Sequence, residues 1–291
     1  MKAFVMKEIG ETDIIEKERP EPGPMDAILK PTKGLICTSD THTVHGAIGE
    51  REDLTLGHEI VGVVDEVGEE VRDFEPGDRV AVGAITPDWN SEAAQAGHPS
   101  QSNQALGGWK FANVKDGTFA EYLHVNDADG NLAHIPDGVT DHEAVYITDM
   151  MSTGFAGAEN ADIPLGGTVA VFAQGPVGLM ATKGAVLQGA GRVIAVETVP
   201  NRQELARTYG ADDIVDFADG DPVEQIMELT DSEGLTRVAI HHVNQLDDGT
   251  VVLLYELQGT QSRAHTVLDG HDDLLAYSIA PGSDPDSARG D

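Results

Sequence analysis

The sequence is poor in cysteine, in basic residues and in long apolar runs, and each shortage excludes a class of protein. A single cysteine among 291 residues excludes an intramolecular disulfide and a four-cysteine zinc site. Lys and Arg number 18 against 51 Asp and Glu, and this net charge of −33 argues against nucleic acid or an anionic membrane as a partner. No apolar run approaches the ~20 residues of a spanning helix, and the start of the chain lacks an apolar signal-peptide core, so we expect a soluble cytoplasmic protein.

Acidic residues are spread along nearly the whole chain instead of forming one block. A surface for a cationic partner would need such a block. A uniform excess is typical of proteins from a salt-rich cytoplasm, where the Debye length falls to about 3 Å at 1 M salt. We therefore predict a halophilic protein that loses stability in dilute salt, because its like charges then repel one another.

Two patterns of apolar residues divide the first 240 residues. Residues 1–150 alternate short apolar runs with Gly and Pro turns, which predicts a compact β-rich domain. Its last part, residues 141–162, favours helix with Asp141 as the N-cap. Residues 151–240 alternate buried-strand runs with helical segments, which predicts βαβ units and a parallel sheet. The fold class is therefore α/β.

The pattern changes again after His242. Residues 243–259 predict a hairpin around Asp248-Gly249, and residues 262–280 predict a short helix followed by a strand. The last residues are expected to form a disordered tail. The predicted segments are 1–150, 151–240, 241–280 and 281–291.

Three polar clusters carry side chains that suit a metal. Cys37 opens the run CTSDTH, His58 and Glu59 lie in GHEIVG, and Asp149 lies in TDMMSTG. A thiolate, an imidazole and carboxylates can together bind zinc, and an exchangeable position admits water or a substrate. Taken alone, each residue also fits a structural role, as a buried thiol, a hydrogen-bonded His–Glu pair or a local cap.

Ser39 and His42 closely follow the cysteine. A catalytic zinc lowers the pKa of an alcohol, which can then give up hydride. A hydroxyl and an imidazole near the metal could carry the released proton to solvent.

The clusters CTSDTH, GHEIVGVVDEVG, FEPGDRV and TDMMSTGF, in this order, resemble the zinc-dependent alcohol dehydrogenases of the medium-chain dehydrogenase/reductase superfamily. TPDW, GGWKFANVKDG and HVNDAD are similar to the secondary alcohol dehydrogenase subgroup, and the resemblance covers residues 1–240. It implies a GroES-like catalytic domain, then an incomplete Rossmann domain. It also implies Zn²⁺, a nicotinamide coenzyme, a small alcohol, aldehyde or ketone as substrate, and a homo-oligomer whose usual interface region is missing here.

The resemblance also implies roles for single residues. The matches to the zinc ligands are Cys37, His58, Asp149 and, as a carboxylate that ligates or exchanges at the metal, Glu59. The matches to the proton relay are Ser39 and His42. The matches to the substrate pocket are Trp109 and, more weakly, Ile85. The structural zinc of other branches is absent, because the segment from Gly83 to Gly108 has no cysteine.

The coenzyme motif departs from the Rossmann fingerprint G-x-G-x-x-G, because Ala173 replaces its first glycine. The run that follows a predicted strand and opens a predicted helix is expected to bind the pyrophosphate. It consists of Gly175, Pro176, Val177 and Gly178. Glu197 ends the next strand, where a carboxylate can bind the adenosine ribose and repel a 2′-phosphate, unless it is one more surface acid. The subgroup's Gly-Ser-Arg phosphate clamp is replaced by Glu197-Thr198-Val199, so we predict NAD over NADP.

The resemblance to the dehydrogenases ends at about His241. The residues after His241 faintly resemble a module of haloarchaeal bacterio-opsin-activator-like regulators, in the segments VNQLDDGTVVLLYELQG and DLLAYSI, which suggests a fused or truncated product. Three functions remain open: an active zinc-dependent dehydrogenase, a non-catalytic remnant that keeps zinc but lacks a complete nicotinamide site, and a zinc-free relative of the quinone reductases. The metal set argues against the third.

Overall fold

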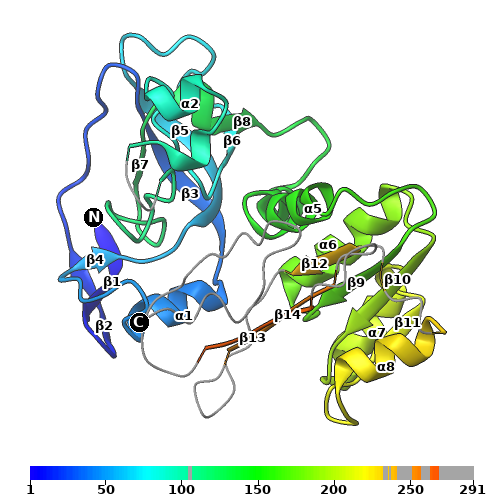
Figure 1. Cartoon of the computed structure of the whole chain (residues 1–291). Helices are drawn as coiled ribbons and strands as arrows, with labels where there is room; N and C mark the ends of the chain where they lie inside the picture. The colour runs from blue at the N-terminus through cyan, green and yellow to red at the C-terminus, as the bar shows by residue number, and fades with distance from the viewer. Residues whose placement is uncertain (104–106, 232–234, 236, 241–250, 257–262, 269–291) are drawn as a thin grey trace. The chain divides into compact units, whose positions relative to one another are not determined.

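The computed structural model describes residues 1–103, 107–231, 235, 237–240, 251–256 and 263–268 (Figure 1). The chain divides into two compact units, Met1–Asp149 and Met150–Asp291. Among the residues described, no helix has the length and hydropathy that a membrane crossing requires.

The first unit is β-rich and contains two antiparallel sheets. The strand orders are β2-β1-β4 in one and β7-β3-β5-β6-β8 in the other. Inward-facing residues of the larger sheet, among them Leu29, Ile60 and Val64, form its apolar core. The elements of this unit are β1 (Lys2–Glu8), β2 (Glu11–Glu16), β3 (Ala27–Leu35), α1 (Thr38–Val44), β4 (Leu54–Thr55), β5 (Glu59–Val67), β6 (Arg79–Val82), α2 (Glu92–Gln95), η1 (Pro99–Gln101), β7 (Leu123–Val125), α3 (Ala128–Asn131), β8 (Leu132–His134), α4 (Asp141–Ala144) and η2 (Val145–Ile147).

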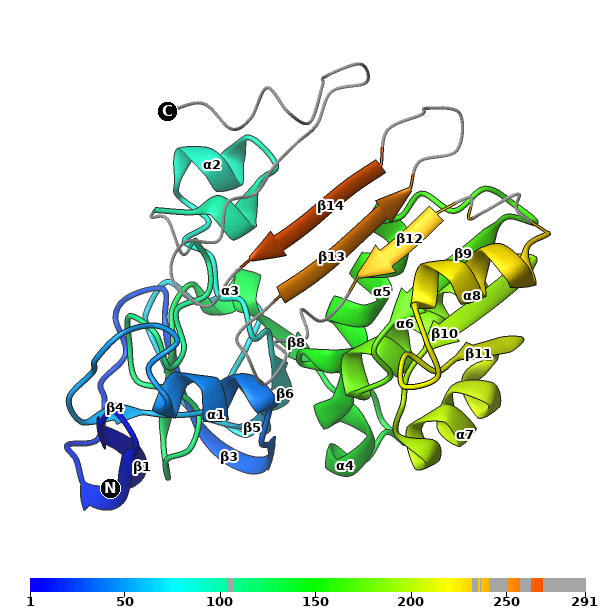
Figure 2. The same cartoon turned by 60° about the horizontal axis from the view of Figure 1, so that its bottom comes forward.

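The second unit contains a parallel sheet with the strand order β11-β10-β9-β12 (Figure 2). The chain order reverses between β9 and β12, which is where doubly wound sheets bind ligands. Its elements are α5 (Met150–Asn160), β9 (Thr168–Phe172), α6 (Pro176–Leu187), β10 (Arg192–Val196), α7 (Pro200–Tyr209), β11 (Asp213–Val215), α8 (Pro222–Leu229), β12 (Arg237–Ile240), β13 (Val251–Glu256) and β14 (Arg263–Leu268).

Helices pack on both faces of this parallel sheet. Val169 and Val171 of β9 pack against Ala181 of α6, whereas Ala170 faces the other way into a cluster with Ile226 of α8. Successive strand side chains point to opposite faces, so a sheet covered on both sides reads as a continuous apolar run. The predicted α/β class, a β-rich domain followed by a Rossmann-type parallel sheet, is confirmed.

Two local predictions are wrong. The helix predicted over residues 141–162 is broken into α4, η2 and α5, and its N-cap is Thr140, whose hydroxyl accepts a hydrogen bond from the Glu143 N–H. Asp141 instead binds Arg79 and Thr32. The segment predicted to begin as a helix contains β14, which pairs antiparallel with β13. The predicted turn at Asp248-Gly249 and the predicted tail lie outside the described residues.

Candidate metal centre and coenzyme loop

The four predicted zinc ligands converge within the first unit. One ligand atom from each of Cys37, His58, Glu59 and Asp149 lies within 4.8 Å of the others. His58 Nε2 lies 3.3 Å from an Asp149 oxygen and 3.8 Å from a Glu59 oxygen. His58 and Glu59 are buried while Cys37 and Asp149 are partly exposed, so an incoming group can approach from their side.

Strand pairing explains why residues distant in sequence meet here. Leu35, at the end of β3, pairs with Glu59, at the start of β5. Cys37 follows β3 directly and precedes α1, so this pairing brings it beside His58 and Glu59. Asp149 lies between η2 and α5, directly before the first residue of α5.

Asp40, which the sequence patterns did not single out, contacts two residues of the cluster. It is only 5% exposed, one of its oxygens accepts a hydrogen bond from His58 Nδ1 at 3.1 Å, and the other accepts the Cys37 N–H at 2.8 Å. A carboxylate on the far ring nitrogen orients a ligating imidazole, here so that Nε2 faces the cluster. The available signal was an acid three residues after Cys37, where a helix-capping side chain is expected.

The electrostatics of the cluster favour a bound cation. Burial raises the pKa of Glu59, and the charges of Asp149 and Asp40 raise it further, to about 7. Burial lowers the pKa of His58, but hydrogen bonds to Asp149, Asp40 and Cys37 outweigh it and raise that pKa to about 12. Glu59 Oε2 is buried and has no hydrogen-bond partner among the described residues. A divalent cation would neutralise the repulsion and give this oxygen a partner, so the site fits zinc.

The predicted proton-relay residues both lie on α1. Ser39 Oγ is 3.3 Å from His58 Nε2, beside the ligand cluster. His42 lies three residues further along the helix and is exposed. No hydrogen bond joins the two side chains in the described part of the chain, so a proton passing between them needs a bridging hydroxyl or water.

Backbone contacts link the segments that carry the two predicted substrate-pocket residues, Ile85 and Trp109, to each other and to the segment before Asp149. The Ala84 N–H bonds the carbonyl of Thr148 at 3.0 Å, which places Ile85 close to Asp149 in the fold. A Cβ on Gly108 would lie 2.6 Å from Cγ2 of Ile85, so the residue preceding Trp109 packs on Ile85. Ile85 is 44% exposed and therefore available to an apolar substrate.

The loop between β9 and α6 has the geometry that a dinucleotide requires. Ala173 takes the left-handed φ of 64° that usually calls for glycine. A Cβ on Gly175 would meet nothing within 4 Å, so the backbone there is open to a ligand at the start of α6. A Cβ on Gly178 would lie 1.8 Å from the Ala173 carbonyl oxygen, so helix and loop touch there. These are the three tasks of the fingerprint glycines, and the loop therefore fits a pyrophosphate.

Glu197 has a structural role that the sequence analysis did not include. It is 3% exposed, and its carboxylate accepts the N–H groups of Gln174, Thr198 and Val199 at 2.9, 2.9 and 3.0 Å. Arg202 Nη1 lies 3.7 Å from the same carboxylate and is half exposed. The acid therefore supports the loop and faces a cation that could meet a 2′-phosphate.

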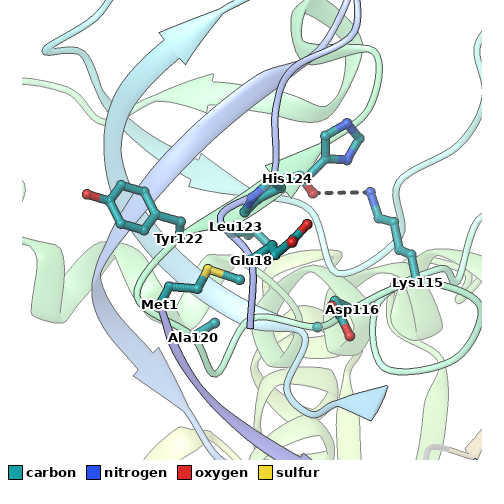
Figure 3. Close-up of a pocket in the computed structure, with 10 residues that line it drawn as sticks. Met1, Glu18, Lys115, Asp116, Ala120, Tyr122, Leu123 and His124 are labelled. Atoms are coloured by element: carbon teal, nitrogen blue, oxygen red, sulfur yellow. Dashed lines mark hydrogen bonds between the residues drawn. The ribbon is translucent and has the colours of Figure 1, made fainter. Parts of the chain in front are cut away.

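A cavity of about 230 Å³ lies elsewhere in the first unit and contains none of the predicted site residues (Figure 3). Lys115 reaches into it and donates to the His124 carbonyl at 3.3 Å and to Asn126 Oδ1 at 2.8 Å. Its ammonium also lies 4.5 Å from the centre of the Phe111 ring. These contacts join separate segments of the first unit, so they explain the position of Lys115 without a ligand.

Family models match both units. A model described as the alcohol dehydrogenase GroES-like domain matches residues 23–137, and one described as zinc-binding dehydrogenase matches residues 176–248. A third, described only as an N-terminal domain, matches residues 222–287 and overlaps the second.

Relatives and solved structures agree with these models. The NADP-dependent isopropanol dehydrogenase of Thermoanaerobacter brockii is 55% identical over 261 residues, which cover 89% of this chain and 74% of that protein. The protein of the same name from Clostridium beijerinckii is 54% identical, over 82% of this chain and 68% of that one. The structure of alcohol dehydrogenase TADH from Thermus sp. ATN1 aligns with a TM-score of 0.77 at 30% identity, over 84% and 71% of the two chains.

The chain belongs to the zinc-type alcohol dehydrogenase family, and it is an enzyme of that type. The family works with zinc and a coenzyme of the NAD(P) class. Both isopropanol dehydrogenases are named NADP-dependent, which conflicts with the predicted preference for NAD. That prediction relied on Glu197 and on the missing Gly-Ser-Arg clamp, and it gave too little weight to Arg202, which lies 3.7 Å from the Glu197 carboxylate.

Proposed function

We propose that this enzyme interconverts small secondary alcohols and ketones, with hydride transfer between the alcohol carbon and NAD(P). The observation that carries the proposal is the convergence of Cys37, His58, Glu59 and Asp149 around one point, with a buried Glu59 oxygen that lacks a partner. In the oxidation, the alcohol loses a hydride to NAD(P)⁺ and a proton to solvent, and the products are a ketone, NAD(P)H and H⁺.

Cys37, His58, Glu59 and Asp149 would hold zinc, which would act as a Lewis acid toward the alcohol oxygen. With zinc bound, Asp40 would accept the Nδ1–H of His58, which directs the other ring nitrogen, Nε2, toward the metal. Ser39 Oγ is placed beside His58 Nε2, where it can accept the alcohol proton, and the exposed His42 can release that proton to solvent.

The coenzyme is held by the second unit in this proposal. Gly175 leaves room for the pyrophosphate, and the N–H groups of Val177 and Gly178 at the start of α6 can bind its oxygens. We propose that NADP(H) is a coenzyme as well as NAD(H), because Arg202 offers a cation near the expected ribose position while Glu197 is already bonded to backbone N–H groups.

Metal analysis combined with turnover tests the proposal. Purified protein should contain about one zinc per chain and should oxidise 2-propanol with NADP⁺ or NAD⁺. Cys37→Ser and Asp149→Asn should lose both zinc and turnover. Asp137→Asn, which removes a charge from an exposed turn of the same unit, should lose neither. Stoichiometric zinc without turnover with either coenzyme would instead favour the non-catalytic remnant.

A further inference from the structure

The loop after β9 contains a strained residue that something must hold in place. Ala173 has a φ of 64°, a left-handed conformation that residues with a Cβ rarely adopt. Such a conformation persists only where the surroundings stabilise it. A glycine would need no such help.

Gln174 supplies the connections that hold this turn. Its side chain donates from Nε2 to the Val171 carbonyl at 3.0 Å and accepts the Thr182 hydroxyl at Oε1, at 2.9 Å. Its backbone N–H donates to Glu197 at 2.9 Å, and the Ala173 N–H donates to the Val196 carbonyl at 2.9 Å. The residue that follows the strained one is thus tied to β9, to α6 and to the end of β10.

Burial shows what kind of role Gln174 has. Gln174 and Thr182 are both 0% exposed, so a coenzyme in the loop would not touch either side chain. Burying an amide and a hydroxyl costs desolvation, and that cost is offset only while each is bonded to the other. Loss of either partner therefore leaves a buried polar group unsatisfied directly beneath the turn.

The turn sets where the loop's ligand-binding groups point. The Ala173 carbonyl packs on Gly178, and Gly175 is the N-cap of α6. A change of φ at Ala173 would therefore move the open backbone at Gly175 and the first N–H groups of the helix relative to β9. The affinity for a pyrophosphate depends on this geometry.

We propose that Gln174, held by Thr182, Val171 and Glu197, is a positioning residue that keeps Ala173 left-handed and thereby sets the affinity of the loop for its dinucleotide. The inference rests on the proposed function, because that function supplies the dinucleotide. It adds a determinant that acts equally on NAD(H) and NADP(H), since neither the adenosine ribose nor its phosphate is involved.

Thr182→Val tests the inference in the full-length protein, because valine keeps the shape of threonine and removes the hydroxyl. Fluorescence titration should give Kd values for NADH and NADPH that both rise about fivefold or more, by the same factor, with unchanged zinc content. Adding Ala173→Gly to Thr182→Val should restore the affinity, because glycine takes the left-handed turn without support.

Thr230→Val is the matched control, since Thr230 is also a buried threonine of the second unit and donates to the Ile226 carbonyl within α8. It should leave both Kd values unchanged. A Thr182→Val protein with wild-type Kd values would overturn the inference. So would an equal loss of affinity in Thr230→Val, which would mark a general loss of stability.

Hydrogen exchange separates failure of this inference from failure of the proposed function. Without coenzyme, Thr182→Val should speed exchange in peptides covering residues 171–182, and Ala173→Gly should reverse the effect. Wild-type protein that binds neither NADH nor NADPH would refute the proposed coenzyme site and, with it, the effect on affinity. Unchanged exchange in Thr182→Val would refute the positioning role by itself.

Discussion

At the scale of single residues, Asp40 links two of the candidate metal ligands. It bonds the ring of His58 through one oxygen and the backbone of Cys37 through the other. Without its charge, the imidazole would lose both its orientation and part of its basicity, and both matter for binding a cation.

We expect Asp40→Asn to weaken zinc binding by about tenfold or more, because outer-shell carboxylates of metal-bound histidines commonly have effects of this size. Competition with a chromophoric chelator measures the affinity. Asp137→Asn serves as the charge-matched control. Equal zinc affinity in Asp40→Asn and wild-type protein would contradict the role given to Asp40.

Lys115 predicts a pH dependence of stability at the same scale. Burial lowers the pKa of Lys115 to about 7, from 10.5 for an unburied lysine. Between these two values the unfolded chain binds more protons than the folded one, so this group makes stability rise with pH from about 7 to 10.5. At neutral pH the unfolded chain is favoured because its Lys115 side chain stays protonated in water. This advantage shrinks as the pH approaches 10.5, where the side chain loses its proton in the unfolded chain as well.

Lys115→Met should therefore flatten the rise of unfolding free energy with pH in this window, relative to wild type. Urea unfolding at several pH values measures it, with the exposed Lys2→Met as the control. Parallel pH profiles for wild type and Lys115→Met would contradict the lowered pKa.

At the scale of elements, the start of α6 combines two glycines with different tasks. A Cβ at Gly178 would collide with the backbone oxygen of Ala173, whereas a Cβ at Gly175 would enter open space. Packing therefore requires glycine at position 178, whereas a bound ligand would require it at position 175.

We expect Gly178→Ala to destabilise the second unit by about 2 kcal/mol, because overpacking forces the helix away from the loop. Gly175→Ala should leave thermal stability nearly unchanged and weaken NAD(P)H binding, because its methyl group would occupy the space for the pyrophosphate. Calorimetry and fluorescence titration separate the two effects. A stability loss in Gly175→Ala as large as in Gly178→Ala would contradict this assignment.

The sequence predicted the elements of the parallel sheet correctly but failed over residues 141–162. The strands and helices from β9 to β12 follow the alternation predicted for residues 151–240, because a sheet buried on both faces needs continuous apolar runs. The predicted helix over residues 141–162 failed because η2 and α5 are separated at Asp149.

At the scale of the whole molecule, a net charge of −33 is the dominant electrostatic feature. Some acids have partners, such as Asp65 with Arg19 and Lys30, but 18 basic residues cannot neutralise 51 acidic ones. Exposed pairs of this kind add little to stability, so they cannot offset the repulsion among the remaining acids.

We propose that the protein is adapted to high salt and expect its thermal midpoint to rise steeply between about 0.1 and 2 M KCl, because screening shortens the reach of the repulsion. Calorimetry in KCl and in an equal osmolarity of sucrose distinguishes screening from solute exclusion. A midpoint independent of KCl would refute the proposal.

The sequence by itself indicated the α/β class, the alternation of strands and helices over residues 151–240, the family and the four candidate metal ligands. Apolar periodicity and short motifs are local properties, so they can be recognised in the sequence without knowledge of the fold. The resemblance named the ligands, whereas the pairing of Leu35 with Glu59 is what brings Cys37 beside His58.

Only the tertiary structure shows the contacts on which the roles proposed for Asp40, Gln174 and Glu197 depend. Their partners lie on other elements, and each side chain is buried, so its function follows from which polar groups the fold places next to it. A buried polar group must be bonded, and the sequence does not say to what.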